Sequence, residues 1–456
     1  MELKKYKLAD IAKIEISGVD KKTMDGEIPV RLCNFVDVYY NWAITKEKAK
    51  SFMVASAKQT EIDKCSIGKD MVAITKDSET RDDIGIATYI ADDFEDVLLG
   101  YHCALITPNP AIVDGKYLNA FMHTRYIQKY FENNASGSGQ RYTLSNDTIS
   151  NIPVLLPSIE EQHTIGKLLA DLDRKIELNK QINDNLEAMA KQLYDYWFVQ
   201  FDFPNEEDKP YKSSGGAMVW NEKLKREIPE GWKVANVFDE LSVQYGFPFS
   251  TELFTEEPTN IPVIRIRDIL ENSVSAYSEE EVDEKYKLQK QDLLVGMDGN
   301  FHMNYWNDNV SYLNQRSVRL RAKSKSAVSI MQAKYDIAPY IKAKELRAKG
   351  STVGHLSDKD LKELFVLVSP NVDFRYKFNS ILAEIIENRC EMIELTKQRD
   401  ELLPLLMNGQ ASVNYHLSVL FITKIMLYYK ETNINFRYER NNNTKRFRWN
   451  ESGSVS

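Results

Sequence analysis

The sequence contains little cysteine or histidine, and neither residue is spaced to hold a metal. Its four cysteines, Cys33, Cys65, Cys103 and Cys390, lie far apart with no CxxC pair, which favours reduced thiols over a zinc site or a disulfide scaffold. Its six histidines show no HExxH or comparable ligand spacing. We therefore expect no metal site, and we expect the 456 residues to form two or three domains stabilised by apolar cores.

Long apolar runs and catalytic motifs are also missing. No uninterrupted segment approaches the roughly 20 apolar residues that a membrane helix needs, and the N-terminal MELKKYKLADIAKIEIS lacks the apolar centre of a signal peptide. The chain contains no GxxxxGK[ST] phosphate loop and no GxSxG elbow, and the glycines of 135–142 lack the GxGxxG spacing of a dinucleotide site. These absences predict a soluble, cytoplasmic protein with no membrane partner and no catalytic residues.

The charge balance does not favour a polyanion over the whole surface. Lys and Arg number 59 against 67 Asp and Glu, which gives a formal net charge of −8. Any site for nucleic acid must therefore be a local basic surface, or must be shared with a partner.

Two distant parts of the sequence resemble each other, which indicates an internal duplication. GQRYTLSNDTISNIPVLLPS (139–158) and GSTVGHLSDKDLKELFVLVSP (350–370) share a spacing of apolar and serine positions, and each leads into a long helix-like stretch. Further matches join 6–14 with 232–241, 28–35 with 261–268, 68–75 with 289–297, and 99–107 with 313–321. Short alternating runs bounded by Asp, Gly and Asn are typical of mixed or antiparallel sheet, so each half is predicted to be an α+β domain followed by a helix.

Each half ends in a helical pattern with a narrow apolar stripe and charged flanks. A helix of roughly 35–40 residues would span roughly 50–60 Å and needs a partner of similar length. We predict that the two helices form an antiparallel coiled coil between two domains related by a pseudo-twofold axis, with Asn179 fixing the register. The alternative is that each helix packs on the core of its own domain. The predicted packing positions are Ile165, Leu168, Leu172, Ile176, Asn179, Leu186, Leu193, Phe378, Ile381, Ile385, Met392, Leu402 and Leu406.

The predicted order is domain, helix, domain, helix. A stretch rich in Pro, Gly, Ser and charge is expected to link the two halves. Beyond the second helix, an apolar run too short to span a membrane is followed by an Asn- and Arg-rich end that we predict to be disordered. The segments are a first domain (1–157), a first long helix (158–201), a linker (202–228), a second domain (229–370), a second long helix (371–409) and an atypical C-terminal extension (410–456).

Several of these segments resemble type I restriction–modification specificity subunits. The resemblance is carried by IPVLLPS, EEQ and IGKLLADLDRKIELNKQI within 152–182, by LYDYWFVQF (193–201), by EIPEGWKVANVFDEL (227–241) and by KQRDELLPLLMNGQASV (397–413). The resemblance is specific, because the motifs, their order and the duplication all agree. It covers nearly the whole chain, and only the segment after 413 departs from the family pattern.

The resemblance implies a DNA-binding subunit without enzyme activity of its own. Each domain would be a target-recognition domain that reads one half of a bipartite, asymmetric sequence in double-stranded DNA. The helices would set the gap and dock two methyltransferase (modification) subunits, and restriction subunits with translocase and nuclease activity would join them. S-adenosylmethionine, ATP and magnesium are expected on these partner subunits. Two other interpretations stay open: a self-contained DNA methyltransferase or nuclease with a scattered catalytic site, and a coiled-coil scaffold that does not bind DNA.

Candidates for DNA contact come from a glycine-rich segment in the first half and from basic residues in the second. Small residues permit close approach of the backbone, while Gln and Arg can reach base edges or phosphates. Strand alternation would place Arg319 and Arg321 on one face. The alternatives are a flexible loop and a solvated strand face. The predicted DNA-binding residues are Ser136, Gly137, Ser138, Gly139, Gln140, Arg141, Tyr142, Arg265, Arg267, Arg316, Arg319, Arg321, Lys349, Gly350, Ser351 and Thr352.

Overall fold

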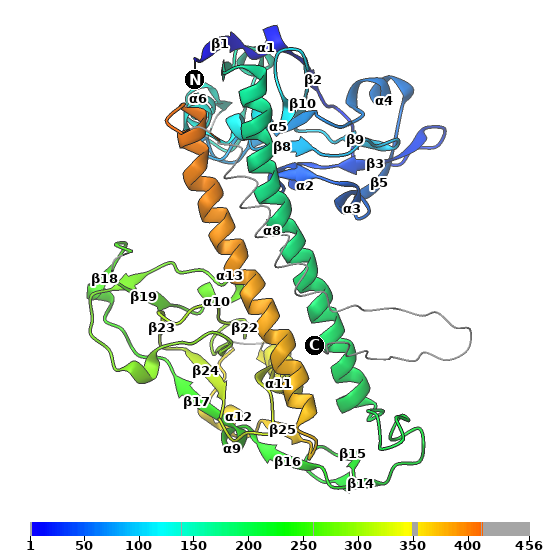
Figure 1. Ribbon diagram of the computed structural model, residues 1–456, viewed down its shortest axis with the longest axis vertical. Helices are drawn as coiled ribbons and strands as arrows, with labels where there is room; N and C mark the ends of the chain where they lie inside the picture. Colours follow the sequence, from blue (N-terminus) through cyan, green and yellow to red (C-terminus); the bar gives the residue numbers. More distant parts are fainter. Residues whose placement is uncertain (1, 138, 259, 349–353, 412, 414–456) are drawn as a thin grey trace, which may run out of the picture. The chain divides into compact units, whose positions relative to one another are not determined.

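The chain forms two compact units in the computed structural model, which describes residues 2–137, 139–258, 260–348, 354–411 and 413. Unit 1 consists of the chain up to Asp173 together with the chain from Gln398, and unit 2 consists of Arg174–Lys397. Two long helices, α8 (Ile159–Tyr194) and α13 (Asp373–Met407), each contribute residues to both units (Figure 1). The predicted mixture of helix and sheet, with a long helix between two domains, is confirmed.

Unit 1 is built on a five-stranded sheet. Its order is β2 (Ala12–Ile16), β10 (Cys103–Pro108), β6 (Val72–Thr75), β8 (Ala87–Ile90) and β4 (Ala43–Ile44). Every residue of β6 and β8 is buried, because the helix α5 (Gly115–Met122) packs against both strands. Smaller sheets join β5 (Met53–Ala57), β3 (Ile28–Cys33) and β9 (Val97–Leu99), then β11 (Ser136–Gly137), β12 (Tyr142–Thr143) and β7 (Asp77–Ser78), and finally β1 (Lys4–Lys7) and β13 (Pro153–Leu156).

Short helices complete unit 1 between these strands. Thr124 caps the amphipathic helix α6, whose Ile127 and Phe131 are buried. The helices are α1 (Leu8–Ile11), α2 (Phe35–Tyr39), α3 (Lys46–Ala49), α4 (Gln59–Cys65), α6 (Arg125–Asn134) and α7 (Asn146–Ser150).

Unit 2 repeats this plan with one strand fewer in its main sheet. Its main sheet has the order β17 (Leu241–Tyr245), β24 (Ser317–Ala322), β21 (Leu293–Gly296) and β22 (Met303–Tyr305). A second sheet joins β18 (Phe254–Thr255), β20 (Tyr277–Ser278), β19 (Ile261–Ile264) and β23 (Tyr312–Leu313), and β16 (Lys233–Asn236) pairs with β25 (Phe365–Val368). The helices are α9 (Val237–Glu240), α10 (Asp268–Glu271), α11 (Ile330–Ala348) and α12 (Asp358–Lys362).

The strand orders of the two units correspond, as the duplication in the sequence predicts. The order β2-β10-β6-β8 has its counterpart in β17-β24-β21-β22, and the antiparallel pair β1-β13 has its counterpart in β16-β25. Each unit also contains one parallel pair in its second sheet, β3 with β9 and β19 with β23. Two copies of one topology therefore make up most of the chain.

Helix α8 begins where its sequence provides a cap. Ser158 follows Pro157, its backbone N–H donates to Glu161 Oε2 at 3.1 Å, and the N–H of Glu161 donates back to Ser158 Oγ at 3.3 Å. The helix ends in a π-helical turn, Asp195–Val199, whose Trp197 and Phe198 enter the core of unit 2.

The predicted apolar stripes face inward on both long helices. In unit 2, α8 and α13 share one apolar cluster with the main sheet and with α11, so the helices pack on each other and on the domain core at once. Of the predicted positions, those buried are Ile165, Leu172, Asn179, Phe378, Ile381, Ile385 and Leu406, and those half-buried are Leu168, Ile176, Leu186, Leu193, Met392 and Leu402.

The segment 202–228 is more ordered than a linker. Within it, β14 (Met218–Asn221) pairs with β15 (Arg226–Pro229). The ring of Phe203 stacks on Tyr211 and on Trp232, with centroids 4.8 Å and 5.2 Å apart. Composition predicts a linker because polar and small residues form most of this segment, whereas a few aromatic side chains anchor it to unit 2.

A polar group connects the end of α8 with α11 and β25 inside unit 2. The hydroxyl of Tyr194 donates to Asp336 Oδ1 at 2.8 Å, while Gln332 Nε2 and the N–H of Leu367 donate to Oδ2, both at 3.1 Å. Burial of the carboxyl group raises the pKa of Asp336 to about 6, and the three hydrogen bonds offset this shift only in part.

All four cysteines are free thiols; Cys33, Cys65 and Cys103 are buried and Cys390 is half-buried. Burial raises the pKa of Cys103 to about 12, which keeps this thiol protonated and unreactive. None of the helices formed by the described residues is long and apolar enough to cross a membrane.

Candidate nucleic-acid interface

Unit 1 gathers three polar side chains from distant parts of its sequence beside the glycine-rich segment. Asp77 begins β7, His102 directly precedes β10, and Arg141 directly precedes β12. His102 Nδ1 lies 2.5 Å from Asp77 Oδ2. An Nη2 atom of Arg141 lies 3.4 Å from the same oxygen and rests against the imidazole, 2.6 Å from Nδ1. We call Asp77, His102 and Arg141 the first trio.

Unit 2 gathers a similar group, the second trio of Asp298, Arg316 and His355. Arg316 Nη1 donates to Asp298 Oδ2 at 2.6 Å, and His355 Nδ1 lies 2.6 Å from the other carboxylate oxygen. Arg316 directly precedes β24, and His355 forms an isolated antiparallel bridge with Asp298. Each trio thus has one carboxylate that contacts one arginine and one histidine.

The strand registers show that the carboxylates occupy equivalent positions. Thr75 of β6 pairs with Cys103 of β10, and Gly296 of β21 pairs with Ser317 of β24. Asp77 and Asp298 each lie two residues beyond the paired position on the first strand. His102 and Arg316 each lie one residue before the paired position on the second strand.

The backbone of these two preceding residues is also alike. His102 and Arg316 both adopt a left-handed conformation, with φ of 69° and 64°. Non-glycine residues rarely adopt such angles, and where they do the surrounding structure must compensate. The same unusual backbone therefore directs a basic side chain towards the carboxylate in each unit.

The third members come from equivalent strands as well. Thr143 of β12 pairs with Asp77 of β7, and His355 bridges Asp298. In both units a buried leucine and then a helix-capping serine follow, namely Leu144 and Ser145 before α7, and Leu356 and Ser357 before α12. Arg141 lies two residues before Thr143, whose position corresponds to that of His355, so the third basic groups come from corresponding segments but not from equivalent positions.

The cations of each trio face outward while the carboxylate is covered. The exposed fraction is 12% for the side chain of Asp77 and 58% for that of Arg141; the corresponding values are 17% for Asp298 and 70% for Arg316. Burial alone would raise the pKa of Asp298, but the hydrogen bonds from His355 and Arg316 outweigh it and lower that pKa. Both carboxylates are therefore ionised at neutral pH and hold exposed basic groups in place.

The lowered pKa of Asp77 has the same balance of causes. Burial acts to raise it, whereas hydrogen bonds from Thr143 and His102 and the charge of Lys76 lower it further than burial raises it. This agreement in electrostatics accompanies the agreement in backbone geometry.

Glycine is required at one position of the segment beside the first trio. Gly137 of β11 pairs with Tyr142 of β12, and a Cβ on Gly137 would lie 2.1 Å from the carbonyl oxygen of Arg141. Gly139 has a φ of 88°, which also favours glycine. The strands β11 and β12 thus pair closely, and Gln140 and Arg141, which precede β12, are exposed. Arg81 lies over the ring of Tyr142, 5.1 Å from its centroid.

Four predicted arginines of unit 2 lie outside the second trio. Arg321 donates to both oxygens of Asp292, at 2.6 Å and 2.7 Å, and Arg319 is buried, with its Nη2 3.1 Å from Ser242 Oγ. Strand alternation does place both on one face, but that face is engaged within the domain, which argues against DNA contact for either residue.

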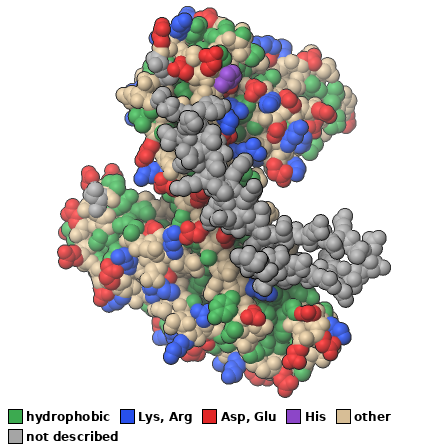
Figure 2. All heavy atoms as spheres, in the orientation of Figure 1, with side chains coloured by type: hydrophobic (Ala, Val, Ile, Leu, Met, Phe, Trp, Pro, Cys, Tyr) green, Lys and Arg blue, Asp and Glu red, His purple; other side chains and the backbone are tan. Residues whose placement is uncertain are grey.

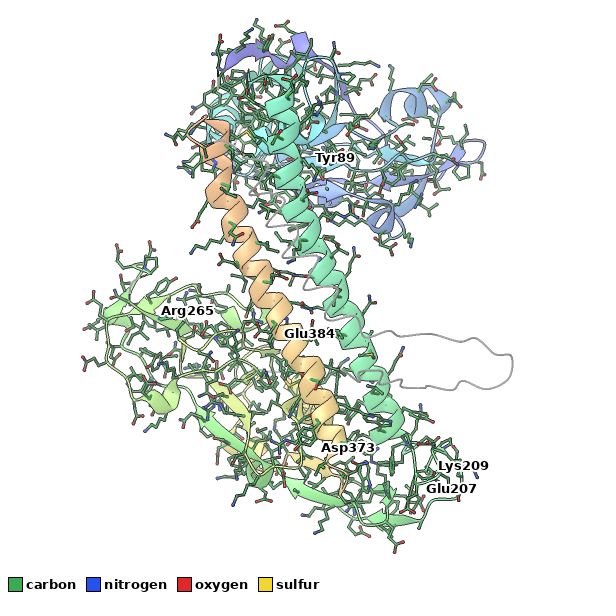
Figure 3. All side chains as sticks on the ribbon, in the orientation of Figure 1. Tyr89, Glu207, Lys209, Arg265, Asp373 and Glu384 are labelled. Carbon is green, nitrogen blue, oxygen red and sulfur yellow. The ribbon has the colours of Figure 1, made fainter. Side chains whose placement is uncertain are left out.

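Arg265 follows β19 and is labelled in Figure 3. It donates to the carbonyl oxygen of Ser275 at 2.7 Å and to the hydroxyl of the same residue. Arg267 is more available, with 66% of its side chain exposed. Arg265 and Arg267 both lie near Asp268, whereas Arg316 contacts Asp298 and so joins the second trio.

The remaining predicted positions divide into two groups. Ser136 is exposed in β11, whereas Ser138, Lys349, Gly350, Ser351 and Thr352 lie outside the described residues. Reasoning from the sequence missed Asp77, His102, Asp298 and His355. A signal was present, because the matched runs 68–75 and 289–297 are each followed within two residues by an aspartate, Asp77 and Asp298.

A polar layer interrupts the apolar contact between α8 and α13 within unit 2. Asn179 is buried, and its Nδ2 donates to Glu391 Oε2 at 2.7 Å, while Lys175 forms an ion pair with Glu391. One turn further along α8, Asn183 donates to the carbonyl oxygen of Ile385 at 3.1 Å. Because residue numbers rise along one helix as they fall along the other, the helices are antiparallel here.

Such a layer specifies the register of the pair. A shift by one turn would leave Asn179 and Asn183 buried without partners, which would lower the free energy of unfolding by about 1–3 kcal/mol for each unsatisfied group. Within unit 1, Asp173 of α8 and Arg399 of α13 lie 3.8 Å apart, so polar contacts between the same two helices continue there.

Charge and metal-ligating residues show no other obvious site among the described residues. On the face that Figure 2 shows, basic and acidic side chains are interspersed over each unit. The described part of the chain has no group of three or more His, Cys, Asp or Glu residues that could hold a metal ion.

Comparison with known proteins agrees with the sequence and the fold. The model of the type I restriction modification DNA specificity domain family matches residues 1–188 and 229–404. The specificity subunit of the type I restriction enzyme MjaIX from Methanocaldococcus jannaschii is 27% identical over 323 residues, which are 68% of this chain and 71% of that protein. The specificity subunit of the Escherichia coli enzyme EcoBI is 27% identical over 184 residues, 39% of this chain and 36% of that protein.

A solved structure shows the same fold. The crystal structure of the S subunit of a type I restriction–modification system from M. genitalium superposes with a TM-score of 0.53 and 14% identity, covering 89% of this chain and 96% of that chain.

Proposed function

Because the chain belongs to the type I restriction modification DNA specificity domain family and is a specificity subunit of such a system, we propose that each of its two units recognises one half of a bipartite, asymmetric sequence in double-stranded DNA. In this role the chain is not catalytic. It directs where partner subunits methylate adenine and where the complete complex restricts DNA.

The single observation that carries this proposal is the duplicated topology. Each unit presents the same strand order, and in each unit a covered carboxylate at an equivalent place contacts an exposed arginine. Two similar readers in one chain suit a target with two separate halves. The differing residues around the shared frame suit two different half-sequences, because base edges in the major groove are distinguished by their donor and acceptor patterns.

The long helices provide the spacing in this proposal. Helix α8 contains 36 residues and is therefore about 54 Å long. DNA-binding modules that act together must meet the duplex at a separation set by its helical repeat of about 34–36 Å. The polar layer around Asn179 and Glu391 specifies the register of the two helices, and in this proposal it keeps the spacing that they set constant.

The outer surfaces of α8 and α13 are the proposed docking sites for two methyltransferase subunits. Restriction subunits with translocase and nuclease activity would bind to that assembly. S-adenosylmethionine, ATP and magnesium are proposed to bind to the partner subunits, since this chain has neither a phosphate loop nor, in its described residues, a cluster of metal ligands.

An exchange of one domain tests the proposal. The chain is co-expressed with its methyltransferase subunit, and methylated adenines are mapped with residues 1–157 native or replaced by the corresponding segment of another specificity subunit. We expect one half of the recognised sequence to change and the other half to persist. If both halves changed together, or if methylation did not depend on this chain, the assignment of one half-site to each unit would be wrong.

Two controls separate this function from its alternatives. The purified chain alone, given DNA and S-adenosylmethionine, should transfer no methyl groups, which distinguishes it from a self-contained methyltransferase. The complex with the methyltransferase subunit should prefer target DNA over other DNA, which distinguishes it from a scaffold that does not bind DNA.

A further inference from the structure

We propose that Asp77 and Asp298 are positioning residues that hold Arg141 and Arg316 against phosphates of the DNA backbone, one in each half of the target. This inference rests on the proposed function, because it assigns a contact type within the surface that would read DNA. The two trios are the structural basis, and each is complete within its own unit.

The first argument is that the trios are shared by both units. A residue that reads a base belongs to one half-site, because the two halves of an asymmetric target differ in sequence. The carboxylates are repeated at the same place in both readers, whereas the arginines come from different positions around them. What the two readers share is therefore an exposed arginine beside a covered carboxylate, and such a shared feature suits a part of the DNA that both halves have in common. The phosphate backbone is common to every sequence, and contacts to it position a protein without specifying bases.

The second argument is the way in which each carboxylate presents its arginine. Asp298 is 17% exposed and accepts from Arg316 Nη1, so the pair is anchored from the inside while 70% of the arginine side chain remains exposed. A guanidinium has five N–H donors in a rigid plane, and one bond to a carboxylate leaves the others free in direction for a second anion. The carboxylate thus limits the movement of the side chain without using up its donors.

The third argument is the backbone conformation that the two sites share. His102 and Arg316 adopt left-handed backbone angles, which residues other than glycine rarely adopt. The same strained conformation appears in both units and in each case directs a basic side chain to the carboxylate. The residue placed in this way is His102 in unit 1 and Arg316 in unit 2, so the shared backbone supports the carboxylate as the fixed point of each trio.

The substitution Asp77→Asn tests whether Asp77 positions Arg141, because two explanations predict opposite changes in DNA affinity. If Asp77 acts only through its charge, its removal brings the surface closer to positive and tightens DNA binding. If Asp77 acts by holding Arg141 and His102, its removal loosens the arginine and weakens binding. We expect Asp77→Asn to weaken binding, and we expect Asp298→Asn to do the same in unit 2.

The experiment measures the affinity of the full-length chain, in complex with its methyltransferase subunit, for a labelled duplex that contains the mapped target. Titrations at several salt concentrations give the slope of log K against log salt. Arg141→Ala and Arg316→Ala should each lower the steepness of this slope by about 0.9, which corresponds to up to roughly eightfold weaker binding at 0.1 M salt relative to a 1 M reference. Preference for target over other DNA should stay within about twofold.

Matched controls use changes of the same kind elsewhere. Arg125→Ala and Arg347→Ala remove exposed arginines from α6 and α11, and should leave the slope unchanged. Asp96→Asn breaks a comparable pair, since Asp96 accepts from Arg31 Nε at 2.8 Å and Nη2 at 2.6 Å, outside either trio. Thermal unfolding of every variant shows whether a loss of binding reflects a loss of fold.

The double variant Asp77→Asn/Arg141→Ala completes the test. If Asp77 acts through Arg141, the double variant binds as weakly as Arg141→Ala and no weaker. Tighter binding by Asp77→Asn, or an unchanged salt slope for both arginine variants, would overturn the inference. A changed half-site with an unchanged slope would also overturn it, because the arginine would then read a base. A native complex that showed no preference among DNA sequences would instead refute the proposed function.

Discussion

If α8 and α13 set the spacing between the two readers, lengthening both by one turn should lengthen the gap in the DNA target and leave both half-sequences unchanged. Four helix-favouring residues inserted after Asp173 in α8, and four after Lys397 in α13, fall where unit 1 and unit 2 meet along the chain. The contact of Asp173 with Arg399 stays on one side of the insertion, and that of Asn179 with Glu391 stays on the other.

The expected magnitude follows from helix and DNA geometry. Four residues add about 6 Å at 1.5 Å per residue, and the duplex rises about 3.4 Å per base pair, so the gap should grow by about two base pairs. The added turn also rotates the helix by about 40° beyond a full circle at 3.6 residues per turn, so a seven-residue insertion, about 20° short of two circles, is a useful companion.

Mapping of methylated adenines in cells that express the altered chain with its methyltransferase subunit measures the gap directly. The matched control is the same insertion in α8 alone, which shifts the register and separates the partners of the polar layer. This control should lower the free energy of unfolding by about 1–3 kcal/mol for each buried polar group left without a partner, and should reduce methylation. An unchanged gap in the doubly lengthened chain, or altered half-sequences, would refute the spacer.

Three further predictions concern single side chains. The folded pKa of Asp336, about 6, lies above its ordinary 3.8, so its contribution to stability is fully present below pH 3.8 and is lost as pH rises through 6. Asp336→Asn should therefore flatten the pH dependence of stability and raise the free energy of unfolding at pH 7 by about 3 kcal/mol, which calorimetry can measure. Lower stability of this variant at pH 7 would contradict that sign. Gly137→Ala should disrupt the pairing of β11 with β12 through its clash with the carbonyl oxygen of Arg141, weakening DNA binding several-fold. The melting temperature should change little, because both strands have two residues, exposed in β11 and half-buried in β12. Arg321→Met should cost about 3 kcal/mol by leaving Asp292 buried and unpaired, yet should leave the salt slope of DNA binding as it is in the native chain; a slope lowered by about 0.9 would show that Arg321 contacts phosphate after all.

Much of the architecture was predictable because it depends on local patterns. The duplicated runs appear in the structure as two copies of one strand order, since apolar alternation specifies which residues face a core regardless of what lies between the runs. The N-terminal cap of α8 is local in the same sense, because Ser158 and Glu161 are three residues apart and contact each other directly.

Composition misled where a few side chains outweigh the average. The segment 202–228 is polar overall, yet Phe203 stacks between two aromatic rings and ties it to unit 2. The strand pattern correctly placed Arg319 and Arg321 on one face, but no local rule indicates that Asp292 lies beside that face and pairs with Arg321.

The sequence by itself determined the duplication, the mixed helix and sheet class and the apolar stripes of the two long helices, because these arise from periodicities within short windows. Only the tertiary structure decided which basic residues share a site. Asp77, His102 and Arg141 are far apart in the chain. They meet because antiparallel pairing sets the register of β10 on β6 and of β12 on β7, and because the left-handed backbone of His102 turns its side chain towards the carboxylate. Long-range register and backbone conformation of this kind depend on the assembled sheet and leave no signal at the spacing of neighbouring residues.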